Sequence, residues 1–296
     1  MKNSNKYLII LINYNNTEDT IECVDSLYQS GINSKSILII DNGSENDTIN
    51  ILKKNYPGIE IIWNKENIGF SAANNIGIKK AISNGFTYAI LLNNDTIVTP
   101  NAISELINIM DKFQDVALGT GQIRMYPEGK KIWYAGGKLI NWRGLAAHIF
   151  FNRKVEEIKL LLIPQYVTFI SGCYLCIRMS ATTKLGLLDE RFFIYLEDIE
   201  YSARAVKKGC KLLYIPTSVI YHKWIGGTKL QNKSLYYAIR NRYLLINISF
   251  NGIAKVYFSI VLVVKMFYWY LTNKESFMTA RRGIQDYKNK YYGPLL

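Results

Sequence analysis

Cysteine and histidine are scarce in this sequence: its 296 residues include four cysteines and two histidines. Four scattered cysteines are too few for a disulfide-stabilised fold. Two of them, Cys173 and Cys176, form a lone C-x-x-C pair, and no further candidate zinc ligands lie near them in the sequence. We therefore interpret them as packing residues and expect a reducing, cytoplasmic environment.

Two further absences argue against common classes of protein. The first apolar run, Tyr7–Ile12, ends at Asn13 and is too short for a signal peptide. No G-x-G-x-x-G follows it, which argues against a dinucleotide-dependent dehydrogenase. A nucleotidyltransferase would need a glycine-rich, basic phosphate loop at this place, and Asn13–Thr17 contains no basic residue. That class stays as the alternative among enzymes.

The sequence has fewer acidic than basic residues, which gives it a formal net charge of +13, and it contains 22 tyrosines. Such a balance indicates an acidic partner: nucleic acid, an anionic membrane or a phosphate-bearing substrate. No nucleic-acid-binding motif is present, and basic residues form no stripe in the first half. A nucleic-acid-binding protein and a catalytically inactive scaffold remain the alternatives outside enzymes.

The first 120 residues alternate between apolar runs and amphipathic stretches. Such apolar runs are typical of strands buried in a parallel sheet, and the stretches between them have helical periodicity. The predicted strands are Tyr7–Asn13, Ser36–Ile40, Ile59–Trp63 and Phe86–Leu92, and the predicted helices are Thr17–Ser30, Thr48–Tyr56 and Ser71–Ser83. This order predicts βαβ units in a doubly wound α/β sheet.

Polar, turn-forming residues follow each of these strands, and ligands of doubly wound sheets bind beyond the carboxyl ends of the strands. Asp41 could accept a hydrogen bond from a uracil or thymine ring, or equally form an Asx-turn. Asn67 and Gly69 lie where a backbone turn would approach phosphates at a helix start. Asn74 continues this polar face into the helix.

Asn93-Asn94-Asp95 follows the fourth strand. A carboxylate there can hold Mg²⁺ or Mn²⁺ together with the phosphates of a donor, and Asn93 could add a carbonyl oxygen. A turn or helix N-cap is the alternative role for Asp95. His222 ends a later strand-like run and is either structural or a further metal ligand. His148 is a candidate for the acceptor side.

Beyond about residue 120 the alternation of strand and helix loosens. The expected elements are a loop or irregular hairpin over Lys130–Phe151, a strand over Tyr166–Arg178, a helix over Glu197–Lys208, and short strands over Lys211–Ile215 and Val219–His222.

The clearest chemical pattern is FFIYLEDIEYSAR, residues 192–204, in which an aromatic run leads into Glu197 and Asp198 at a helix start. A carboxylate there can act as general base for an acceptor hydroxyl, and the helix N-terminus favours its ionised form. An acidic helix start without catalytic function is the alternative. Glu200 and Arg204, four residues apart, are predicted to form a surface ion pair.

Together these segments resemble the family-2 inverting glycosyltransferases of the GT-A fold, in particular their bacterial rhamnosyltransferase-like branch. The motifs that carry the resemblance are NYNNTEDTIECVDSL, IIDNGSENDT, NIGFSAANNIGIKKA, LLNNDT, SGCYLCIR, GLLDERFFIYLEDIEYSARAVKKGCKLLYIPTSVIYH, YYAIRNRYLL and RRGIQDYKNKYYG. They extend over nearly the whole chain in the family's order.

The resemblance implies roles for the candidate residues. Asp198 would be the catalytic base, with Glu197 shaping the sugar and acceptor site. Asp95 would be the metal-holding end of the family's D-x-D element, with His222 helping to hold the metal or the diphosphate. Asn93 replaces the first acid of that element, so it offers the metal a single carboxylate. The residues expected to bind the nucleotide sugar are Asn13, Tyr14, Asp41, Asn67, Gly69, Asn74, Asn93 and Asn94.

Inversion at the anomeric carbon would require Asp95 and Asp198 to flank that carbon across a single cleft. The expected donor is dTDP-rhamnose or a UDP-hexose, and the expected acceptor is a glycan or lipid-linked sugar of cell-surface polysaccharide. The expected organisation is a GT-A catalytic domain over residues 1–230, with a nucleotide-sugar and metal half (1–120) and an acceptor and base half (121–230), followed by a helical region over 231–296.

Gly252–Leu271 is long enough to span a bilayer, but Lys255 and Lys265 interrupt it. About 80° apart around a helix, these lysines suit a helix lying in the membrane interface. A core helix or a dimer-forming helix is the alternative. Further attraction to anionic lipid is expected from Arg240, Arg242, Lys274, Arg281 and Arg282. The expected location is therefore the cytoplasmic face of the plasma membrane, with a homodimer left open and no nucleic acid expected.

Overall fold

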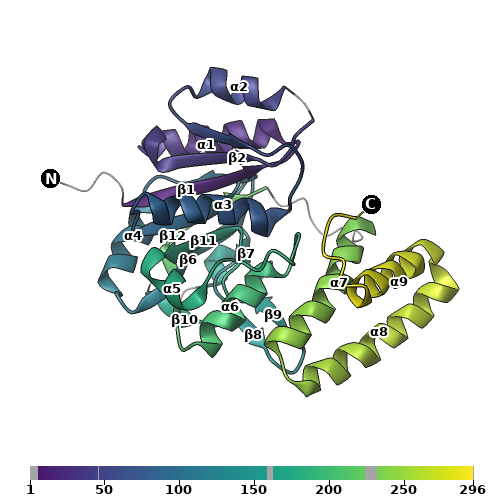
Figure 1. Cartoon of the computed structure of the whole chain (residues 1–296). Coiled ribbons are helices and arrows are strands. Elements are labelled where there is room, and N and C mark those ends of the chain that lie inside the picture. Colours follow the sequence, from purple (N-terminus) through teal and green to yellow (C-terminus); the bar gives the residue numbers. More distant parts are fainter. Residues whose placement is uncertain (1–5, 46, 159–162, 224–231, 296) are drawn as a thin grey trace.

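The computed structural model describes residues 6–45, 47–158, 163–223 and 232–295. Within them, a ten-stranded sheet has eight strands in the order β10-β12-β6-β11-β4-β1-β2-β3, while β5 pairs with β12 and β7 with β6 (Figure 1). The strands are β1 Tyr7–Asn13, β2 Ile37–Asp41, β3 Glu60–Trp63, β4 Tyr88–Asn93, β5 Thr96–Val98, β6 Val116–Met125, β7 Ile132–Tyr134, β10 Gln165–Val167, β11 Tyr174–Arg178 and β12 Lys211–His222.

Helices cover both faces of this sheet (Figure 1). The helices are α1 Thr17–Gln29, α2 Thr48–Asn55, α3 Phe70–Ser83, α4 Ala102–Lys112, α5 Thr182–Leu185, α6 Glu197–Lys207, α7 Asn232–Ser249, α8 Gly252–Thr272 and α9 Lys274–Lys288. Alternate residues of β1 point to opposite faces: Ile9 and Leu11 pack with α1, α2 and α4, while Leu8 and Ile10 pack with α3, α5 and α6. The predicted doubly wound α/β fold is thereby confirmed.

The strands β3, β2, β1 and β4 run parallel, as do β6 and β12, whereas β11 is antiparallel between β4 and β6. The sheet is therefore mostly parallel, as expected. In the first 93 residues, each predicted strand and helix is present and its ends differ by at most two residues from those expected. Continuous apolar runs such as YLIILIN determined these strands because both faces of the sheet are buried.

Three elements that the sequence pattern did not indicate lie between residues 96 and 125: β5, α4 and β6. Glycines interrupt the apolar pattern of β6. A Cβ atom at Gly119 would lie 2.4 Å from Met110 Sδ, and one at Gly121 would lie 2.3 Å from the carbonyl oxygen of Ser218. Close packing at these two positions therefore requires glycine, and the glycines obscure the strand in the sequence.

Two predictions for the second half were wrong in detail. Instead of one strand over Tyr166–Arg178, the chain has β10 and β11, because the first pairs with β12 at the sheet edge and the second lies between β6 and β4. Instead of two short strands, β12 is continuous, with a register shift between Ile215 and Val219 that accommodates Pro216. The irregular hairpin is present as β8 Gly137–Ile140 and β9 Leu145–His148.

The predicted surface pair of Glu200 and Arg204 is not at the surface. Glu200 is 5% exposed, and its Oε2 accepts a hydrogen bond from Arg204 Nη2 at 2.6 Å. Arg204 Nη1 also donates to the carbonyl oxygens of Leu185 and Leu187. The pair therefore fastens the end of α5 to α6, because this side of α6 packs against α5.

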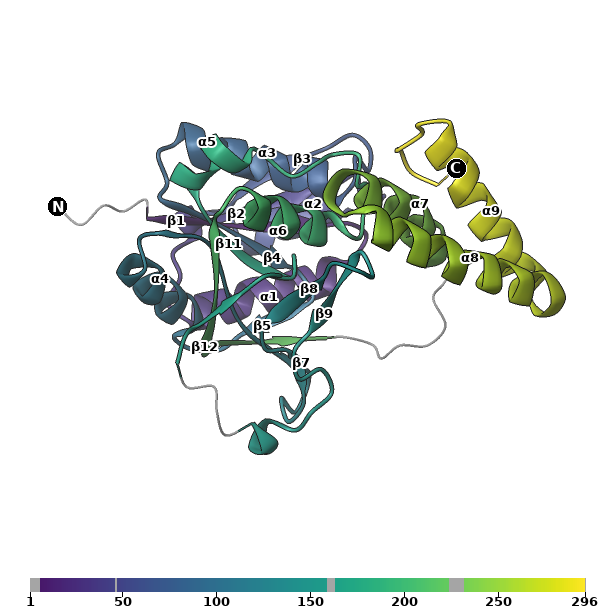
Figure 2. The same ribbon diagram turned by 90° about the horizontal axis from the view of Figure 1, so that it is seen from below.

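The last three helices form an arm beside the sheet domain (Figures 1 and 2). α7 contacts α6 on one side and α9 on the other, and α8 contacts both α7 and α9. The arm has its own apolar cluster, which includes Ile239, Phe258 and Leu262. In the described part of the chain, α8 is the one helix long and apolar enough to cross a membrane. The expected domain boundary near residue 230 lies outside the described residues.

Candidate active site

A cavity of about 220 Å³, here called the strand-end cavity, opens at the carboxyl ends of β1, β2 and β4. Such a place is where doubly wound sheets bind their ligands. Of the residues predicted to bind the donor, Tyr14, Asn67, Asn93 and Asn94 line it, together with Asp95. The other lining residues are Ile12, Asn16, Asn42, Phe70, Phe193 and Ile194.

Asn13 and Asp41 lie behind this cavity and are fully buried. The Asp41 carboxylate accepts hydrogen bonds from Asn13 Nδ2 at 2.8 Å, from the Ser44 amide at 3.0 Å and from Ser44 Oγ at 2.6 Å. Asn13 Oδ1 accepts from Thr20 Oγ1 at 2.7 Å. The bonds to Ser44 form the Asx-turn that was the alternative role of Asp41. Its contact with a pyrimidine ring stays a prediction.

Gly69 precedes α3 with a φ of +91°, and a Cβ atom there would lie 2.7 Å from the carbonyl oxygen of Phe193. That oxygen accepts a hydrogen bond from the Phe70 amide at 2.6 Å. Asn67 Oδ1 accepts from the Gly69 amide at 2.9 Å. The first turn of α3 thus already binds a protein carbonyl, and glycine is required because the segment at Phe193 approaches so closely. Phosphate binding by this turn stays a prediction.

Asn74 is not brought into the strand-end cavity. It is 1% exposed, and its Nδ2 donates to the Phe70 carbonyl within α3. The adjacent Asn75 exchanges hydrogen bonds with the backbone of Leu188 and donates to Glu190. The polar side of α3 therefore packs against the segment at residues 188–190, which explains the buried asparagines without a ligand.

Asp95 and His222 meet because β5 and β12 pair directly beside them. His222 Nε2 lies 3.2 Å from Asp95 Oδ2, whereas Asp95 Oδ1 and His222 Nδ1 are buried without a hydrogen-bond partner in the described residues. Burial alone would raise the pKa of Asp95, but the hydrogen bond and charge of His222, with Lys223, hold it below its ordinary value. An ionised carboxylate beside an imidazole, each with an unpaired atom, fits a divalent cation.

The described residues contain no cluster of three or more His, Cys, Asp or Glu side chains that could hold a metal ion. Asp95 and His222 would therefore supply two ligands. Mg²⁺ is commonly bound by one or two carboxylates, with its coordination completed by water and substrate phosphates. The single carboxylate left by Asn93 is thus compatible with a cation that binds together with its phosphate-bearing substrate.

Glu197 and Asp198 form an acid pair at the start of α6. Asp198 Oδ2 accepts from the Gly172 amide at 3.0 Å and Oδ1 from the Ile199 amide at 2.8 Å. Burial raises the pKa of Asp198, and these backbone donors lower it. Burial, assisted by the charge of Asp198, raises the pKa of Glu197 to about 8, and Glu197 Oε2 has no partner in the described residues. Because the charge of Asp198 adds to the rise in the pKa of Glu197, Asp198 is the acid of the pair that ionises first.

The acid pair lines a second cavity of about 220 Å³, here called the acid-pair cavity. Its other lining residues are Ala146, His148, Phe169, Tyr195, Leu196 and Ile199. The expectation of a single cleft is therefore not met, since Asp95 lines the strand-end cavity and Asp198 the acid-pair cavity. The chain from Phe193 to Asp198 runs between them, and its first two residues line one cavity while the rest line the other.

The two cavities are nevertheless neighbours. Gly172 donates its amide to Asp198, and the next residue, Cys173, accepts a hydrogen bond at its carbonyl oxygen from the Asn93 amide at 3.0 Å. The Trp133 ring lies 4.6 Å, between centroids, from the rings of both His148 and His222. Two consecutive backbone residues thus connect Asp198 to Asn93, and one indole ring connects His148 of the acid-pair cavity to His222.

Sequence reasoning missed Gly172, Trp133 and Phe193. Gly172 stands under the acid pair, where a Cβ atom would already contact Asp198 Cβ at 3.5 Å. The Phe193 carbonyl oxygen binds α3, and its ring stacks on Tyr237 of α7. A glycine directly before an apolar strand, and an aromatic run before two acids, were the available signals. Neither signal identifies a partner that lies so far away in the sequence.

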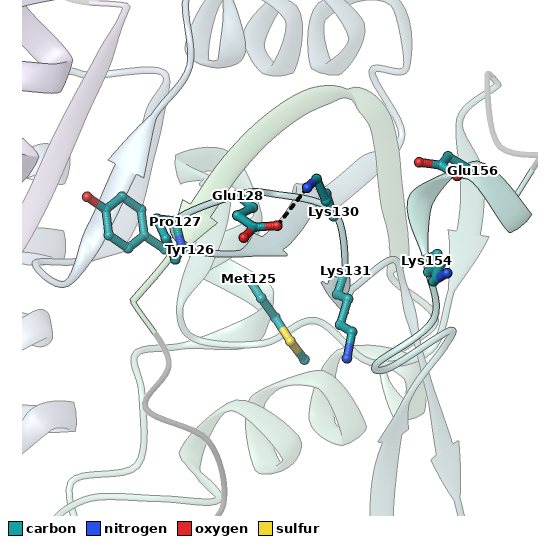
Figure 3. A pocket seen from close by; sticks show the side chains of 8 residues that line it. All are labelled: Met125, Tyr126, Pro127, Glu128, Lys130, Lys131, Lys154 and Glu156. Carbon is teal, nitrogen blue, oxygen red and sulfur yellow. Dashed lines mark ion pairs between the residues drawn. The ribbon is translucent and has the colours of Figure 1, made fainter.

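Another cavity, of about 500 Å³, lies beyond β6 (Figure 3). It is lined by Met125, Tyr126, Pro127, Glu128, Lys130, Lys131, Lys154 and Glu156. Lys130 pairs with Glu128 at 2.9 Å, and the lysines are exposed. None of the predicted catalytic or metal-binding residues lines it, so its chemistry is that of a solvated basic surface.

Comparison with known proteins identifies the family of this chain. A model of the family described as glycosyl transferase family 2 matches residues 8–186. The chain belongs to this family. The matched segment of this family-2 chain includes Asp41 and Asp95 and ends before the acid pair at Glu197 and Asp198.

Two relatives share the family-2 sequence pattern. The chain is 26% identical over 204 residues to N-acetylglucosaminyl-diphospho-decaprenol L-rhamnosyltransferase of Mycobacterium tuberculosis, covering 64% of this chain and 66% of that protein. It is 24% identical over 252 residues to the low-salt glycan biosynthesis hexosyltransferase Agl10 of Haloferax volcanii, covering 82% and 76%. The match thus spans slightly less than two thirds of the mycobacterial protein.

The fold is also that of a solved glycosyltransferase. The crystal structure of GalNAc-T7 with UDP, GalNAc and Mn²⁺ superposes with a TM-score of 0.67 and 19% identity, over 87% of this chain and 50% of that chain. At this identity the likeness concerns the fold alone. It confirms the expected GT-A architecture of this family-2 chain.

Proposed function

We propose that this chain transfers a sugar from a nucleoside-diphosphate donor to an acceptor hydroxyl with inversion. The observation that carries the proposal is the arrangement of two adjacent acids near the Asp95–His222 pair. Burial raises the pKa of both acids, and the charge of Asp198 raises that of Glu197 further, while Gly172 and Cys173 connect Asp198 to the end of β4. Titratable neighbours whose pKa values are pushed apart are typical of acid and base roles.

Each group then has a task in the reaction. Asp198 accepts the proton of the acceptor hydroxyl, and Glu197 donates a hydrogen bond to a sugar oxygen. Asp95 and His222 would hold Mg²⁺ or Mn²⁺, which would neutralise charge on the departing diphosphate. The nucleotide is held by Tyr14, Asn67, Asn93 and Asn94, which line the strand-end cavity, and by Asn13 and Asp41 behind it. The donor sugar must lie where the two cavities adjoin.

The names of the relatives support a finer proposal. One relative is named as an L-rhamnosyltransferase with a diphospho-decaprenol acceptor, and another as a hexosyltransferase of glycan biosynthesis. We therefore propose dTDP-rhamnose or a UDP-hexose as donor, and a glycan or lipid-linked sugar of cell-surface polysaccharide as acceptor. The catalytic domain is proposed to extend over residues 1–230, with the helical region over 231–296.

A donor screen tests this function. Purified protein is incubated with dTDP-rhamnose or individual UDP-hexoses, and released nucleoside diphosphate is measured in Mn²⁺, Mg²⁺ or EDTA. We expect one donor to be hydrolysed when a divalent cation is present. In Asp95→Ala the cation should no longer stimulate hydrolysis, because one of the two protein ligands of the cation is gone. Asp115→Ala, at an exposed ion pair with Lys211, is the control. Equal hydrolysis in EDTA would exclude the metal role, and release of pyrophosphate from nucleoside triphosphates would favour a nucleotidyltransferase.

The arm exposes a surface that a lipid-linked acceptor would explain. Nine apolar side chains of α8 are at least 60% exposed: Ile253, Val256, Ile260, Val263, Val264, Phe267, Tyr268, Tyr270 and Leu271. Their spacing of three and four residues places them on one side of the helix. We call this set the α8 stripe. The opposite side, with Ala254, Phe258 and Leu262, is buried within the arm.

The two lysines of α8 do not interrupt the stripe. At 100° per residue, Lys265 lies roughly 20° and Lys255 roughly 100° around the helix axis from Ala254, which is on the buried side. Both lysines therefore lie on the side of the helix opposite the stripe. Arg240 is fully buried and Arg242 half-buried, so neither can attract lipid as expected. The exposed cations beside the helix are Lys255, Lys265, Lys274, Arg281 and Arg282. A continuous apolar stripe with cations beside it, on a protein of net charge +13, fits an anionic bilayer surface.

Vesicle flotation tests this proposal. We expect the full chain to float with vesicles that contain anionic lipid and to float less with neutral vesicles, because both apolar burial and charge contribute. Val263→Glu combined with Phe267→Glu should abolish flotation, whereas Ser259→Glu, outside the stripe, should not. If the native chain stays unbound and the double variant converts a dimer to a monomer in sedimentation, the stripe is a dimer interface instead.

A further inference from the structure

Asn241 of α7 reaches the chain segment that leads into the acid pair. It is fully buried, and its Nδ2 donates to two consecutive carbonyl oxygens, of Ile194 at 2.8 Å and Tyr195 at 2.9 Å. These residues directly precede Leu196 and the acids of α6. One amide group of the arm therefore holds a stretch of chain that borders both the strand-end cavity and the acid-pair cavity.

The held segment has a backbone that does not form easily by itself. Tyr195 has a φ of 70° and Leu196 a φ of 71°, so two consecutive residues with a Cβ atom adopt the left-handed conformation. Side chains other than glycine seldom adopt it because the Cβ atom approaches the neighbouring carbonyl oxygen. Such a backbone persists where the surrounding structure holds it, and it concentrates at functional sites. The two hydrogen bonds from Asn241 are that support.

The orientation of the Asn241 amide is itself fixed by the arm. Its Oδ1 accepts a hydrogen bond at 3.0 Å from Nε of Arg240, a guanidinium that is fully buried. Arg240 lies over the rings of Tyr236 and Tyr237 and donates to the carbonyl oxygen of Gly293 at 2.6 Å. Because Arg240 can only donate, the amide oxygen must face it and the amide nitrogen must face the two carbonyls.

Tyr236 and Tyr237 extend the connection to the end of the chain. Tyr236 Oη donates to Asp286 Oδ2 of α9 at 2.7 Å, and Tyr237 Oη accepts from the Leu295 amide at 2.8 Å. The Tyr237 ring stacks on Phe193, with centroids 5.5 Å apart and planes at 8°. The arm thus holds the segment at three consecutive residues, Phe193 by stacking and the next two by hydrogen bonds.

We propose that Asn241 is a positioning residue of the transfer reaction. By holding the left-handed pair before α6, it sets where Asp198 and Glu197 stand relative to the end of β4. The helical arm is therefore a part of the active site, in addition to any part it plays at a membrane. This inference rests on the proposed function, because it requires Asp198 to act as the base.

Asn241→Ala tests the inference. We expect kcat to fall roughly 10–100-fold, because a base displaced by about 1 Å loses alignment with the acceptor hydroxyl. KM for the donor should stay within about twofold, since the residues that line the strand-end cavity are unchanged. Asn247→Ala is the matched control: it removes an exposed asparagine of the same helix that bonds to Tyr243 and Tyr287. It should leave both constants as they are.

A glycine substitution separates positioning from general loss of structure. Glycine adopts positive φ without strain, so the segment in Tyr195→Gly should depend less on the two hydrogen bonds from Asn241. In a double-mutant cycle, Asn241→Ala should lower kcat severalfold less in the Tyr195→Gly background than in the native one. An equal loss in both backgrounds, or an unchanged kcat in Asn241→Ala alone, would overturn the positioning role. If Asp198→Asn still transfers sugar, the proposed function fails instead, whatever the cycle shows.

Discussion

Asp198→Asn should lower the rate of sugar transfer about 10²–10⁴-fold, the usual contribution of a general base. The amide is nearly the same shape and retains an oxygen for the backbone N–H of Gly172 or Ile199, but it cannot take the acceptor proton. The strand-end cavity does not contain this residue, so affinity for the nucleotide donor should stay within about twofold. Initial rates with donor and acceptor, together with calorimetric titration of the nucleoside diphosphate, measure the two quantities.

Asp189→Asn is the control for this substitution, because Asp189 pairs with Arg191 and stands eight residues before Glu197 in the chain. It should transfer sugar at the native rate. Because burial raises the pKa of Asp198, the native rate should also fall at acid pH, at a pH above that of an ordinary aspartate. Normal turnover by Asp198→Asn would remove this residue from the role of base.

The part of the fold that could be predicted from the sequence is the part determined by residues close together in the chain. YLIILIN must be buried on both faces, and its neighbours in the chain have the periodicity of helices, so β1 and the elements up to β4 followed directly. The pairing of Asp95 with His222 was also accessible, since both stand at strand ends and His222 is one of two histidines in the sequence. Chemistry that follows from residue type and strand order can be predicted.

What could not be predicted depends on contacts between distant segments. Gly119 and Gly121 weaken the pattern of β6, and only Met110 and Ser218 explain why glycine is needed there. The left-handed pair at Tyr195 and Leu196 is invisible in the sequence because neither residue favours positive φ. Its support, Asn241, stands 46 residues further along the chain from Tyr195. The division into two cavities has the same origin, because it follows from the path of this segment.

The acid pair also implies that the enzyme is less stable than it could be, and Glu197→Gln should reveal this. Burial raises the pKa of Glu197 from its ordinary 4.5 to about 8. Between these two values the unfolded chain loses the proton while the folded chain keeps it, so the free energy of unfolding falls as pH rises. Each unit of pKa difference corresponds to about 1.4 kcal/mol. The full penalty, on the order of a few kcal/mol, is reached above pH 8 and is absent below pH 4.5.

Glutamine has no proton to lose, so the variant should lack this decline and be the more stable protein at pH 8. Its amide would still leave one polar atom unpaired, which costs about as much as the unpaired Glu197 Oε2 does in the native protein. We expect a melting temperature higher by roughly 5 °C or more at pH 8, shrinking to nothing near pH 5, in scans run with EDTA. Glu156→Gln, at an exposed position, should match the native protein at every pH. A variant that melts no higher than the native protein at pH 8 would show that Glu197 is ionised in the folded state. The proposal that Asp198 is the base and Glu197 the hydrogen-bond donor would then be wrong.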